Sequence, residues 1–236
     1  MRQFIFTKQI IFIAVGVAVL VVGGVLIFAT TDKGEPPIAH LKFDEGSGQY
    51  AYDSSGNNNI GTASSTMTTS SMWVSGVYGS AVDFDGVNDY IDMGDKDSFS
   101  FGNGSTDLPF SFSLWAKMDD ATNFRMLSKF GDSNIEYLFV VHSDDKLSLW
   151  IYDSNVYYRA RKYDVALTSY EGKWVHFGAT YDGSKTAAGI KLYVNGKYVE
   201  SSDVSSGAYT AMNNRSASLK VGWGNGYANG IIDDVK

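Results

Sequence analysis

The strongest constraint on the fold is a period-two alternation of apolar and polar residues, repeated in short runs from residue 38 onward. In residues 110–118 (FSFSLWAKM) every second side chain is apolar, and Trp115 stands among the intervening polar positions. Successive side chains of a strand point to opposite faces, so this run predicts a strand with one face in the core. Outside residues 10–29, no stretch offers three clean turns of helical periodicity. The alternation therefore predicts an all-β protein.

Further stretches carry the same signal. Residues 147–152 (LSLWIY) and 174–181 (WVHFGATY) alternate, and residues 190–199 hold the pair Asn195-Gly196 between two short runs. Asn-Gly supplies the positive φ angles of a type I′ hairpin turn. A content of Gly 25, Tyr 15 and Phe 14 against Pro 3 also suits strands joined by tight turns. Short strands at this spacing predict one sandwich or jelly-roll domain over residues 38–236.

The N-terminal segment has a different character. Residues 10–29 (IIFIAVGVAVLVVGGVLIFA) carry no charge, and a helix of this length spans about 30 Å, the thickness of the hydrocarbon core. We expect a transmembrane signal anchor here, with residues 1–9 as a cytoplasmic tail and residues 30–37 as a polar linker. A cleaved signal peptide is the main alternative, although the residues after 29 match a cleavage site poorly. A prepilin leader is a third, but its glycine and glutamate are not found here.

Charge and cysteine content exclude several classes of function. The formal net charge is -7, and no basic patch is present, so the sequence predicts no nucleic-acid partner. Cys 0 excludes disulfides, thiol nucleophiles and zinc-thiolate sites.

One short stretch concentrates acids. Residues 82–94 (VDFDGVNDYIDMG) contain four aspartates around Gly86, which suggests a metal loop, a carboxylate pair or a turn. Apolar residues flank the acids on both sides, and glycine and asparagine favour tight turns. We interpret residues 85–89 as the tight connection between two strands, a hairpin signature with mainly a folding role.

A set of motifs in fixed order carries a resemblance to a known family. They are LKFDEGSG (41–48), DSSG (53–56), GT (61–62), FDGVNDY (84–90), FSLWAK (112–117), WVH (174–176), TYDG (180–183), LYVNG (192–196) and IDDV (232–235). In this order they resemble the laminin G-like (concanavalin A-like lectin/glucanase) domain family over about residues 38–236. The resemblance implies a two-sheet antiparallel jelly-roll sandwich with one concave face, used for binding carbohydrate or protein. In that family the IDDV strand continues for several residues, so we expect the sequence to be truncated in its last strand.

Catalysis is not expected, although glucanases share this fold. A glycosidase needs two carboxyl groups ~5 to 9.5 Å apart across the scissile bond. The superfamily's Glu-x-Asp-x-x-Glu string is absent, and the five glutamates are far from one another. His40, His142 and His176 lie in no nucleophile-elbow context. The sequence therefore predicts a protein that is not an enzyme.

Calcium is the one cofactor that the sequence suggests. The ion takes ~6 to 8 oxygen ligands, which aspartates beside glycines supply. The resemblance implies a structural calcium ion near the junction of the first and last strands, so Asp44 and Asp233 are the first choices, with Asp85 and Asp89 as second choices. The alternative is that these acids only bond to turns and strand ends.

A sugar-binding surface should be aromatic, because the apolar C–H faces of sugars stack on indole and phenol rings. Trp150 and Tyr152 fit best, since they alternate with core residues, and Trp115 has the same placement. Tyr157 and Arg159 belong to the next predicted strand and would add hydrogen bonds or pair with an acidic glycan. The alternative is that these aromatic residues line a sheet covered by loops.

Two functional hypotheses follow. The first is a membrane-anchored, extracytoplasmic module on the cell surface that binds extracellular or cell-wall polysaccharide without catalysis. The second is a surface adhesion or protein-interaction domain without a sugar site. A third hypothesis is a fragment of a glycan-active enzyme.

Overall fold

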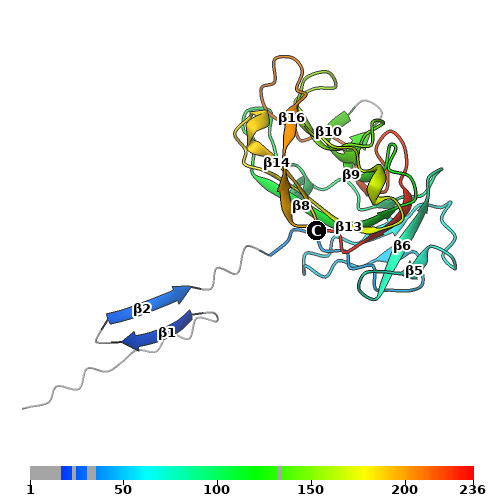
Figure 1. Ribbon diagram of the computed structural model, residues 1–236, viewed down its shortest axis with the longest axis horizontal. Coiled ribbons are helices and arrows are strands. Elements are labelled where there is room, and N and C mark those ends of the chain that lie inside the picture. The colour runs from blue at the N-terminus through cyan, green and yellow to red at the C-terminus, as the bar shows by residue number, and fades with distance from the viewer. Residues whose placement is uncertain (1–16, 23–24, 31–35, 132–133) are drawn as a thin grey trace, which may run out of the picture. The chain divides into compact units, whose positions relative to one another are not determined.

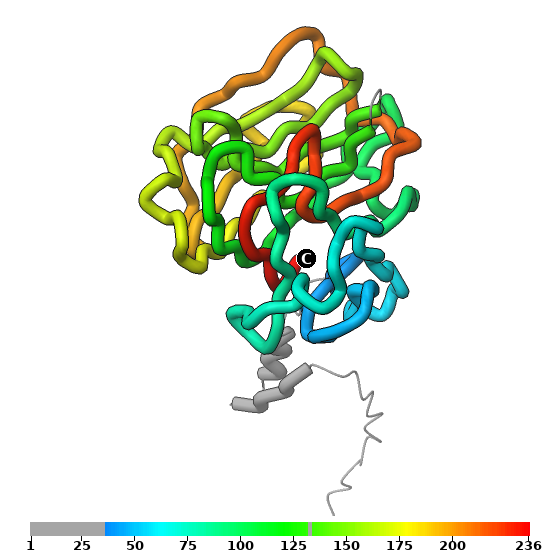
Figure 2. The backbone as a smooth tube through the Cα atoms, turned by 90° about the vertical axis from the view of Figure 1, so that its right-hand side faces the viewer, coloured from blue at the N-terminus to red at the C-terminus, as the bar shows by residue number. Residues whose placement is uncertain are grey.

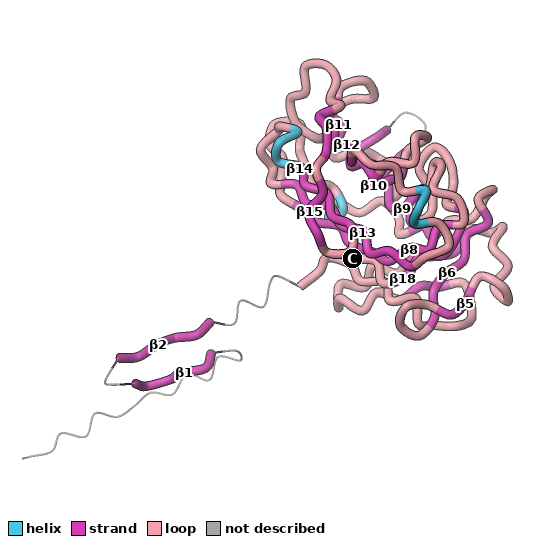
Figure 3. The backbone as a smooth tube through the Cα atoms, viewed as in Figure 1, coloured by secondary structure: helices cyan, strands magenta, loops and turns pink. Residues whose placement is uncertain are grey.

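The alternating runs form the strands of two antiparallel sheets in the computed structural model, which describes residues 17–22, 25–30, 36–131 and 134–236. The chain divides into two units, Met1–Pro36 and Pro37–Lys236. Loops of different lengths and three turns of 3-10 helix, Asp97–Phe99, Thr168–Tyr170 and Ala187–Gly189, connect the strands of the second unit (Figure 3). The prediction of an all-β fold with two antiparallel sheets is confirmed for this unit.

The larger sheet has nine strands. Its order is β16 (Ser201–Asp203), β12 (Tyr158–Tyr163), β11 (Leu147–Tyr152), β10 (Asn134–Val141), β9 (Arg125–Gly131), β17 (Leu219–Val221), β7 (Ile91–Asp92), β4 (Gly61–Ala63) and β3 (Tyr50–Ala51). The smaller sheet has seven, in the order β15 (Lys197–Val199), β14 (Ile190–Val194), β13 (Trp174–Tyr181), β8 (Phe110–Met118), β18 (Asn229–Asp233), β6 (Ser80–Asp85) and β5 (Trp73–Ser75). Figure 1 shows the two as layers, with β9 and β10 in one and β8 and β13 in the other.

The core lies between the sheets and is rich in aromatic rings. On β8, Phe112 packs against Tyr137 and Phe139 of β10, with ring centroids 5.1 and 6.2 Å apart. The Tyr137 hydroxyl donates to the carbonyl oxygen of Phe99 at 2.9 Å, so this buried polar group is satisfied. Each fully buried side chain of this size contributes about 1.5–3 kcal/mol to stability. The apolar half of the alternating pattern therefore joins the two layers.

Two local turn predictions have different outcomes. The β14–β15 hairpin turns at Asn195 (φ 51) and Gly196 (φ 72), which confirms the type I′ turn. Residues 85–89 do connect two strands tightly, but β6 belongs to the smaller sheet and β7 to the larger one. The hairpin interpretation of residues 82–94 is therefore wrong, because this turn passes the chain from one sheet to the other.

The C-terminal residues lie beside the beginning of the domain. Leu41 forms an antiparallel bridge with Val235, and Figure 2 shows this last stretch (red) next to the first part of the domain (blue). β18 itself pairs with β8 on one side and β6 on the other. The segment with the IDDV motif thus occupies a central position in the smaller sheet.

The N-terminal unit is described only in part. Val17–Val22 (β1) and Val25–Thr30 (β2) are paired antiparallel strands, whereas a helix was predicted over residues 10–29. Residues 1–16, 23–24 and 31–35, with the predicted cytoplasmic tail and most of the linker, lie outside the described residues. Within the described part of the chain, no helix is both long and apolar enough to cross a bilayer.

Candidate functional site

Cross-strand pairing builds a continuous row of side chains on the outer face of the larger sheet, the face turned away from the core. Residues directly paired in antiparallel strands point to the same face. Starting from Trp150, the successive partners run through most of the strands of the sheet. The row is Tyr50, Thr62, Asp92, Lys220, Ser128, Leu138, Trp150 and Ala160. Residues far apart in the sequence thus meet on one surface.

The segment of residues 222–228 folds over the middle of this row. The Ser128 hydroxyl donates to the carbonyl oxygen of Trp223, and Trp223 forms a bridge with Tyr227. A Cβ at Gly224 would lie 3.0 Å from Ser128 Oγ and 3.2 Å from Leu138 Cδ2, so the segment approaches the sheet closely at this glycine. The segment divides the outer face into two regions, which we call the hollow side (β4, β7 and β17) and the arginine side (β9 to β12).

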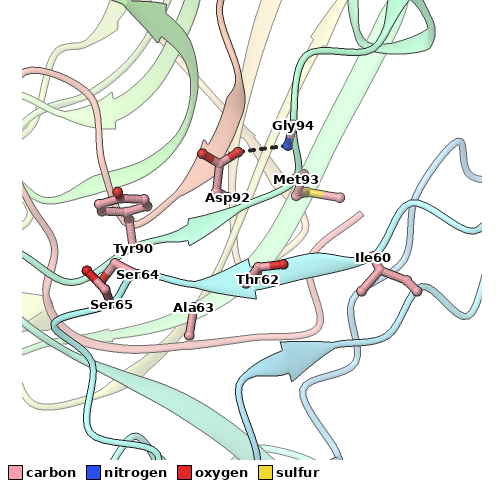
Figure 4. Close-up of a pocket in the computed structure, with 9 residues that line it drawn as sticks. All are labelled: Ile60, Thr62, Ala63, Ser64, Ser65, Tyr90, Asp92, Met93 and Gly94. Carbon is pink, nitrogen blue, oxygen red and sulfur yellow. Dashed lines mark hydrogen bonds between the residues drawn. The ribbon is translucent and has the colours of Figure 1, made fainter.

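The hollow side contains a depression of about 470 Å³. Figure 4 shows Thr62 on β4 and Asp92 on the adjacent β7 among the residues that line it. Asp92 Oδ1 accepts the amide N–H of Gly94 at 2.7 Å, an Asx turn that fixes the carboxylate. The lining residues are Ile60, Thr62, Ala63, Ser64, Ser65, Tyr90, Asp92, Met93 and Gly94. The depression therefore offers hydroxyl groups, one oriented carboxylate and one aromatic ring.

A cation stands between two aromatic rings beside this hollow. Lys220 Nζ lies 4.6 Å from the ring centroid of Tyr90 and 4.3 Å from that of Trp223. Trp223 in turn packs edge-on against Phe130, with centroids 5.3 Å apart. Cation–π contacts of this kind hold the two rings in place, and Lys220 is the cross-strand partner of Asp92.

The arginine side contains the two aromatic residues that the sequence favoured. Trp150 is half-buried, stacks on His142 at 5.7 Å and contacts Tyr158 at 4.7 Å. Its Nε1 donates to Ser148 Oγ at 2.9 Å. Tyr152 is only 8% exposed and packs on Tyr158 at 5.3 Å, and burial raises its pKa far above the usual range. Both point away from the core as predicted, but Tyr152 is covered by its neighbours.

Trp115 does not join this group. It lies on β8 of the smaller sheet, paired with His176 and Asp233, and its ring meets His176 edge-on at 5.2 Å. The outer faces of the two sheets look in opposite directions, because each is the reverse of a face that packs on the core. Trp115 and Trp150 therefore lie on different surfaces of the domain.

Tyr157 and Arg159 also lie apart from Trp150. Arg159 pairs with Ile151, so it points to the core-side face at the edge of the sheet, where its guanidinium lies 5.0 Å from the Tyr209 ring. It donates to the carbonyl oxygen of Gly207 at 3.2 Å. Tyr157 is 44% exposed, precedes β12, and lies against Gly207. Register thus separates Arg159 from the predicted aromatic surface, and Tyr157 lies in the loop before β12.

The first-choice calcium ligands bind a turn. Asp233 Oδ2 accepts the amide N–H groups of Val77 and Tyr78 at 2.8 and 3.3 Å, and Asp44 Oδ1 accepts that of Ser80 at 3.3 Å. Asp233 is fully buried, and its Oδ1 has no hydrogen-bond partner. Burial raises the pKa of Asp233.

One oxygen of each of these two carboxylates is occupied by amide N–H donors of the turn. Calcium needs ~6 to 8 oxygen ligands, whereas Asp44 and Asp233 each face amide N–H donors. Over residues 36–131 and 134–236, no group of three or more acidic, histidine or cysteine side chains is placed to hold a metal.

The second-choice ligands, Asp85 and Asp89, close the turn between β6 and β7. Asp85 Oδ1 accepts the amide N–H groups of Val87 and Asn88 at 2.8 and 3.1 Å, while Asp89 Oδ2 accepts that of Asp85 at 3.2 Å. Burial, and then the negative charge of Asp85, raises the pKa of Asp89. Their hydrogen bonds give these acids the folding role that was assigned to the stretch.

Several residues of this surface were not proposed from the sequence. Tyr90 and Asp92 were considered only as part of the acid-rich stretch, and Lys220 and Trp223 were not considered. The usable signal was the glycine-rich run GWGNG at residues 222–226, since a tryptophan between glycines indicates a loop that approaches another surface closely.

Comparisons with known proteins agree with this architecture. The profile of the family described as "Concanavalin A-like lectin/glucanases superfamily" matches residues 85–236, more than half of the chain. Botulinum neurotoxin type C, which interacts with two ganglioside molecules, is 13% identical with a TM-score of 0.51, over 84% of this chain and 46% of that one. The binding domain of botulinum neurotoxin DC, in complex with rat synaptotagmin II, is 12% identical with a TM-score of 0.51, over 85% and 47%.

Domains LG4-5 of the mouse laminin alpha1 chain are 14% identical, with a TM-score of 0.47, over 66% of this chain and 40% of that one. The chain spans less than half of the length of each of these three structures. Comparison with curated proteins gives no match. At these identities the structural likeness shows the fold alone.

Proposed function

Because the chain belongs to the concanavalin A-like lectin/glucanases superfamily, we propose that residues 37–236 form a non-catalytic carbohydrate-binding module. The binding site is the hollow of the larger sheet, and the observation that carries the proposal is the composition of its lining. Thr62, Ser65 and Asp92 present polar groups to a depression of about 470 Å³, within the size range of small-molecule sites.

The chemistry of the hollow suits a sugar. The fixed carboxylate of Asp92 keeps one oxygen for a sugar hydroxyl, since the other accepts the amide N–H of Gly94. The Thr62 side chain is exposed and able to donate and accept hydrogen bonds. Tyr90 provides an aromatic ring for the apolar face of a pyranose. A shallow, open site with these groups fits one or two sugar units of a longer chain.

The lining also supports a non-catalytic role. Among the described residues that line the hollow, Asp92 is the only acid. Hydrolysis of a glycosidic bond requires a second carboxyl group across the bond. We expect no release of reducing ends when the protein is incubated with polysaccharides that it binds.

Binding by hollow variants tests the proposal. The full-length chain, solubilised in a neutral detergent, is run in native gels that contain neutral or acidic polysaccharides, and retardation gives the affinity. We expect Thr62→Val and Asp92→Asn each to weaken binding about tenfold, the loss of roughly 1.4 kcal/mol in one hydrogen bond. Thr180→Val is the matched control, because Thr180 lies on the outer face of the smaller sheet. Retardation that is unchanged in both hollow variants would overturn the assignment of the site.

A second function is favoured by one observation. Tyr152 is only 8% exposed, so one of the two favoured sugar-stacking residues is covered by its own neighbours. A surface adhesion domain that binds proteins requires no aromatic sugar platform. A broad glycan array without any hit, performed with protein shown to be folded by its melting curve, would favour this second function.

The proposal extends to location. Twenty uncharged residues at positions 10–29 follow Arg2 and Lys8, which supports a membrane anchor with the domain on the extracytoplasmic side. Protease treatment of intact cells tests this. Digestion of the domain only after the cells are opened would contradict an extracytoplasmic location.

A further inference from the structure

The arginine side of the outer face contains a buried guanidinium without an acidic partner. Arg125 is the first residue of β9 and pairs with Val140, which places it on the same face as Trp150. It is 8% exposed, and its Nε is buried with no hydrogen-bond partner. Among the described residues, Nη2 donates only to Asn123 Oδ1 at 3.3 Å and to the carbonyl oxygen of Asn225 at 3.5 Å. Both distances are long for bonds from a cation.

This lack of a partner is unusual for a buried cation. In the described part of the chain, the five ion pairs involve Lys129, Lys162, Lys236 and His40, and none of them includes Arg125. A guanidinium removed from water loses hydration energy that a paired carboxylate normally offsets. Burial accordingly lowers the pKa of Arg125. The Nε and Nη2 edge is the part of the fork that binds a carboxylate side-on.

The surroundings of Arg125 are basic and aromatic, in a protein whose net charge is -7. Burial, and then the charges of Lys162 and Arg125, lowers the pKa of His142, so these two cations act on the same place. Asp144 is held by Lys162 at 3.0 Å. The Arg125 charge also acts to lower the pKa of Tyr152, although burial dominates there and raises it. An anion that enters here meets the unpaired Arg125, with the Lys162–Asp144 ion pair nearby, beside the rings of Trp150 and Tyr158.

We propose that Arg125 binds the carboxylate of an acidic sugar, with the half-buried Trp150 and Tyr158 rings contacting the apolar face of the same sugar. Gly226 lies against Nε and Nη2, so the carboxylate enters by displacing residues 225–226 from the guanidinium. It then replaces the long contact between Nη2 and the Asn225 carbonyl and supplies the missing acceptor for Nε. This inference rests on the proposed carbohydrate-binding function and adds the substrate class, a glycan that contains uronic-acid units.

Matched polysaccharides that differ only in their carboxyl groups test the inference. Polygalacturonate, alginate and hyaluronan are each compared with their carboxyl-reduced forms by affinity electrophoresis of the full-length chain in neutral detergent. We expect at least one acidic form to bind tenfold or more tightly than its reduced form. In Arg125→Leu this ratio falls below twofold, while affinity for the reduced form is retained. Lys191→Met, which removes an exposed charge from β14 of the smaller sheet, keeps the ratio.

Arg125→Lys preserves the charge without the planar fork, so its ratio falls between those of the wild type and Arg125→Leu. It also serves as the deciding variant where Arg125→Leu fails to fold, as judged by thermal melting. Equal binding of the acidic and reduced forms by the wild type overturns this inference and leaves the carbohydrate-binding proposal intact. A preference that survives in both Arg125 variants overturns it as well. Absence of binding to every form overturns both proposals.

Discussion

The outer faces of the two sheets carry the same alternating sequence pattern but differ in what lies over them. On the larger sheet, Ser128, Val140 and Ser148 are completely buried although they point away from the core. On the smaller sheet, Ser111 of β8 is exposed and Trp115 has a single aromatic contact, with His176. Alternation thus decides which side chains leave the core, and the loops decide how much of each outer face is covered.

Replacement of each tryptophan by alanine gives the largest expected difference in stability between the two faces. Trp150→Ala removes contacts with His142 and Tyr158 and the bond to Ser148, so we expect a loss of roughly 3 kcal/mol in the free energy of unfolding. Trp115→Ala removes one edge contact, and we expect a loss of roughly 1 kcal/mol. Urea unfolding of the full-length variants measures both. An equal or larger loss for Trp115→Ala would show that the two faces are built alike.

The hydrogen bond between Ser128 and Trp223 tests how residues 222–228 are held over the larger sheet. Ser128→Ala leaves the Trp223 carbonyl without its donor, and we expect a loss of about 1 kcal/mol together with faster hydrogen exchange of the Gly224 and Ala228 amides. Ser113→Ala is the matched change on the outer face of β8, with an expected loss below about 0.5 kcal/mol. Unchanged exchange in Ser128→Ala would mean that the segment is held by other contacts.

His142 on the larger sheet's side and His176 on the smaller sheet allow the pH dependence of stability to be compared between the two faces. Burial lowers the pKa of both His142 and His176, helped by Lys162 and Arg125 at the first and by Lys236 at the second. The unfolded chain therefore binds protons to these histidines more readily than the folded protein does. Their contribution to the free energy of unfolding is complete above the unfolded pKa of about 6.5 and falls as the pH drops below it. His142→Gln and His176→Gln should each reduce the loss between pH 7 and pH 5, as measured by melting temperature. A steeper loss in either variant would contradict this sign.

The turn that joins the two sheets gives the smallest expected effect. Asp89 has a pKa raised by burial and by Asp85, so its charged form is disfavoured in the folded protein. Its contribution is most favourable at low pH and is lost as the pH rises from about 3.8 through the raised value. We expect Asp89→Asn to increase stability at pH 7 by less than about 1 kcal/mol, with the turn bond to Asp85 kept by the amide oxygen. A decrease measured by urea unfolding would show that the carboxylate itself is needed.

Much of the local structure was predictable from the sequence. The strands at Phe110–Met118, Leu147–Tyr152 and Trp174–Tyr181, and the turn at Asn195-Gly196, are confirmed because each depends on side-chain period or backbone conformation over a few residues. The connection at residues 85–89 was recognised as a tight turn, but its strands belong to different sheets. A turn motif specifies a change of direction and not the partner of the strand that follows.

The site was less predictable. The outward direction of Trp150 and Tyr152 followed from alternation, whereas the separation of Trp115 and Arg159 from them depends on sheet membership and register. Lys129 is a second case in which the partners come from other parts of the chain. Its ammonium group is fully buried, 2.7 Å from Glu136 and 2.8 Å from Asp95. Neither the hollow nor the unpaired Arg125 has a local sequence pattern.

By itself, the sequence determined the all-β class, the turns and the side chains that leave each strand, because these depend on neighbours within about four residues. Only the tertiary structure decided that Thr62, Asp92 and Lys220 adjoin in one row, and that residues 222–228 lie across it. The physical reason is that backbone hydrogen bonds pair strands without regard to distance along the chain. The surface chemistry of a sheet is therefore set by which strands pair and in what register.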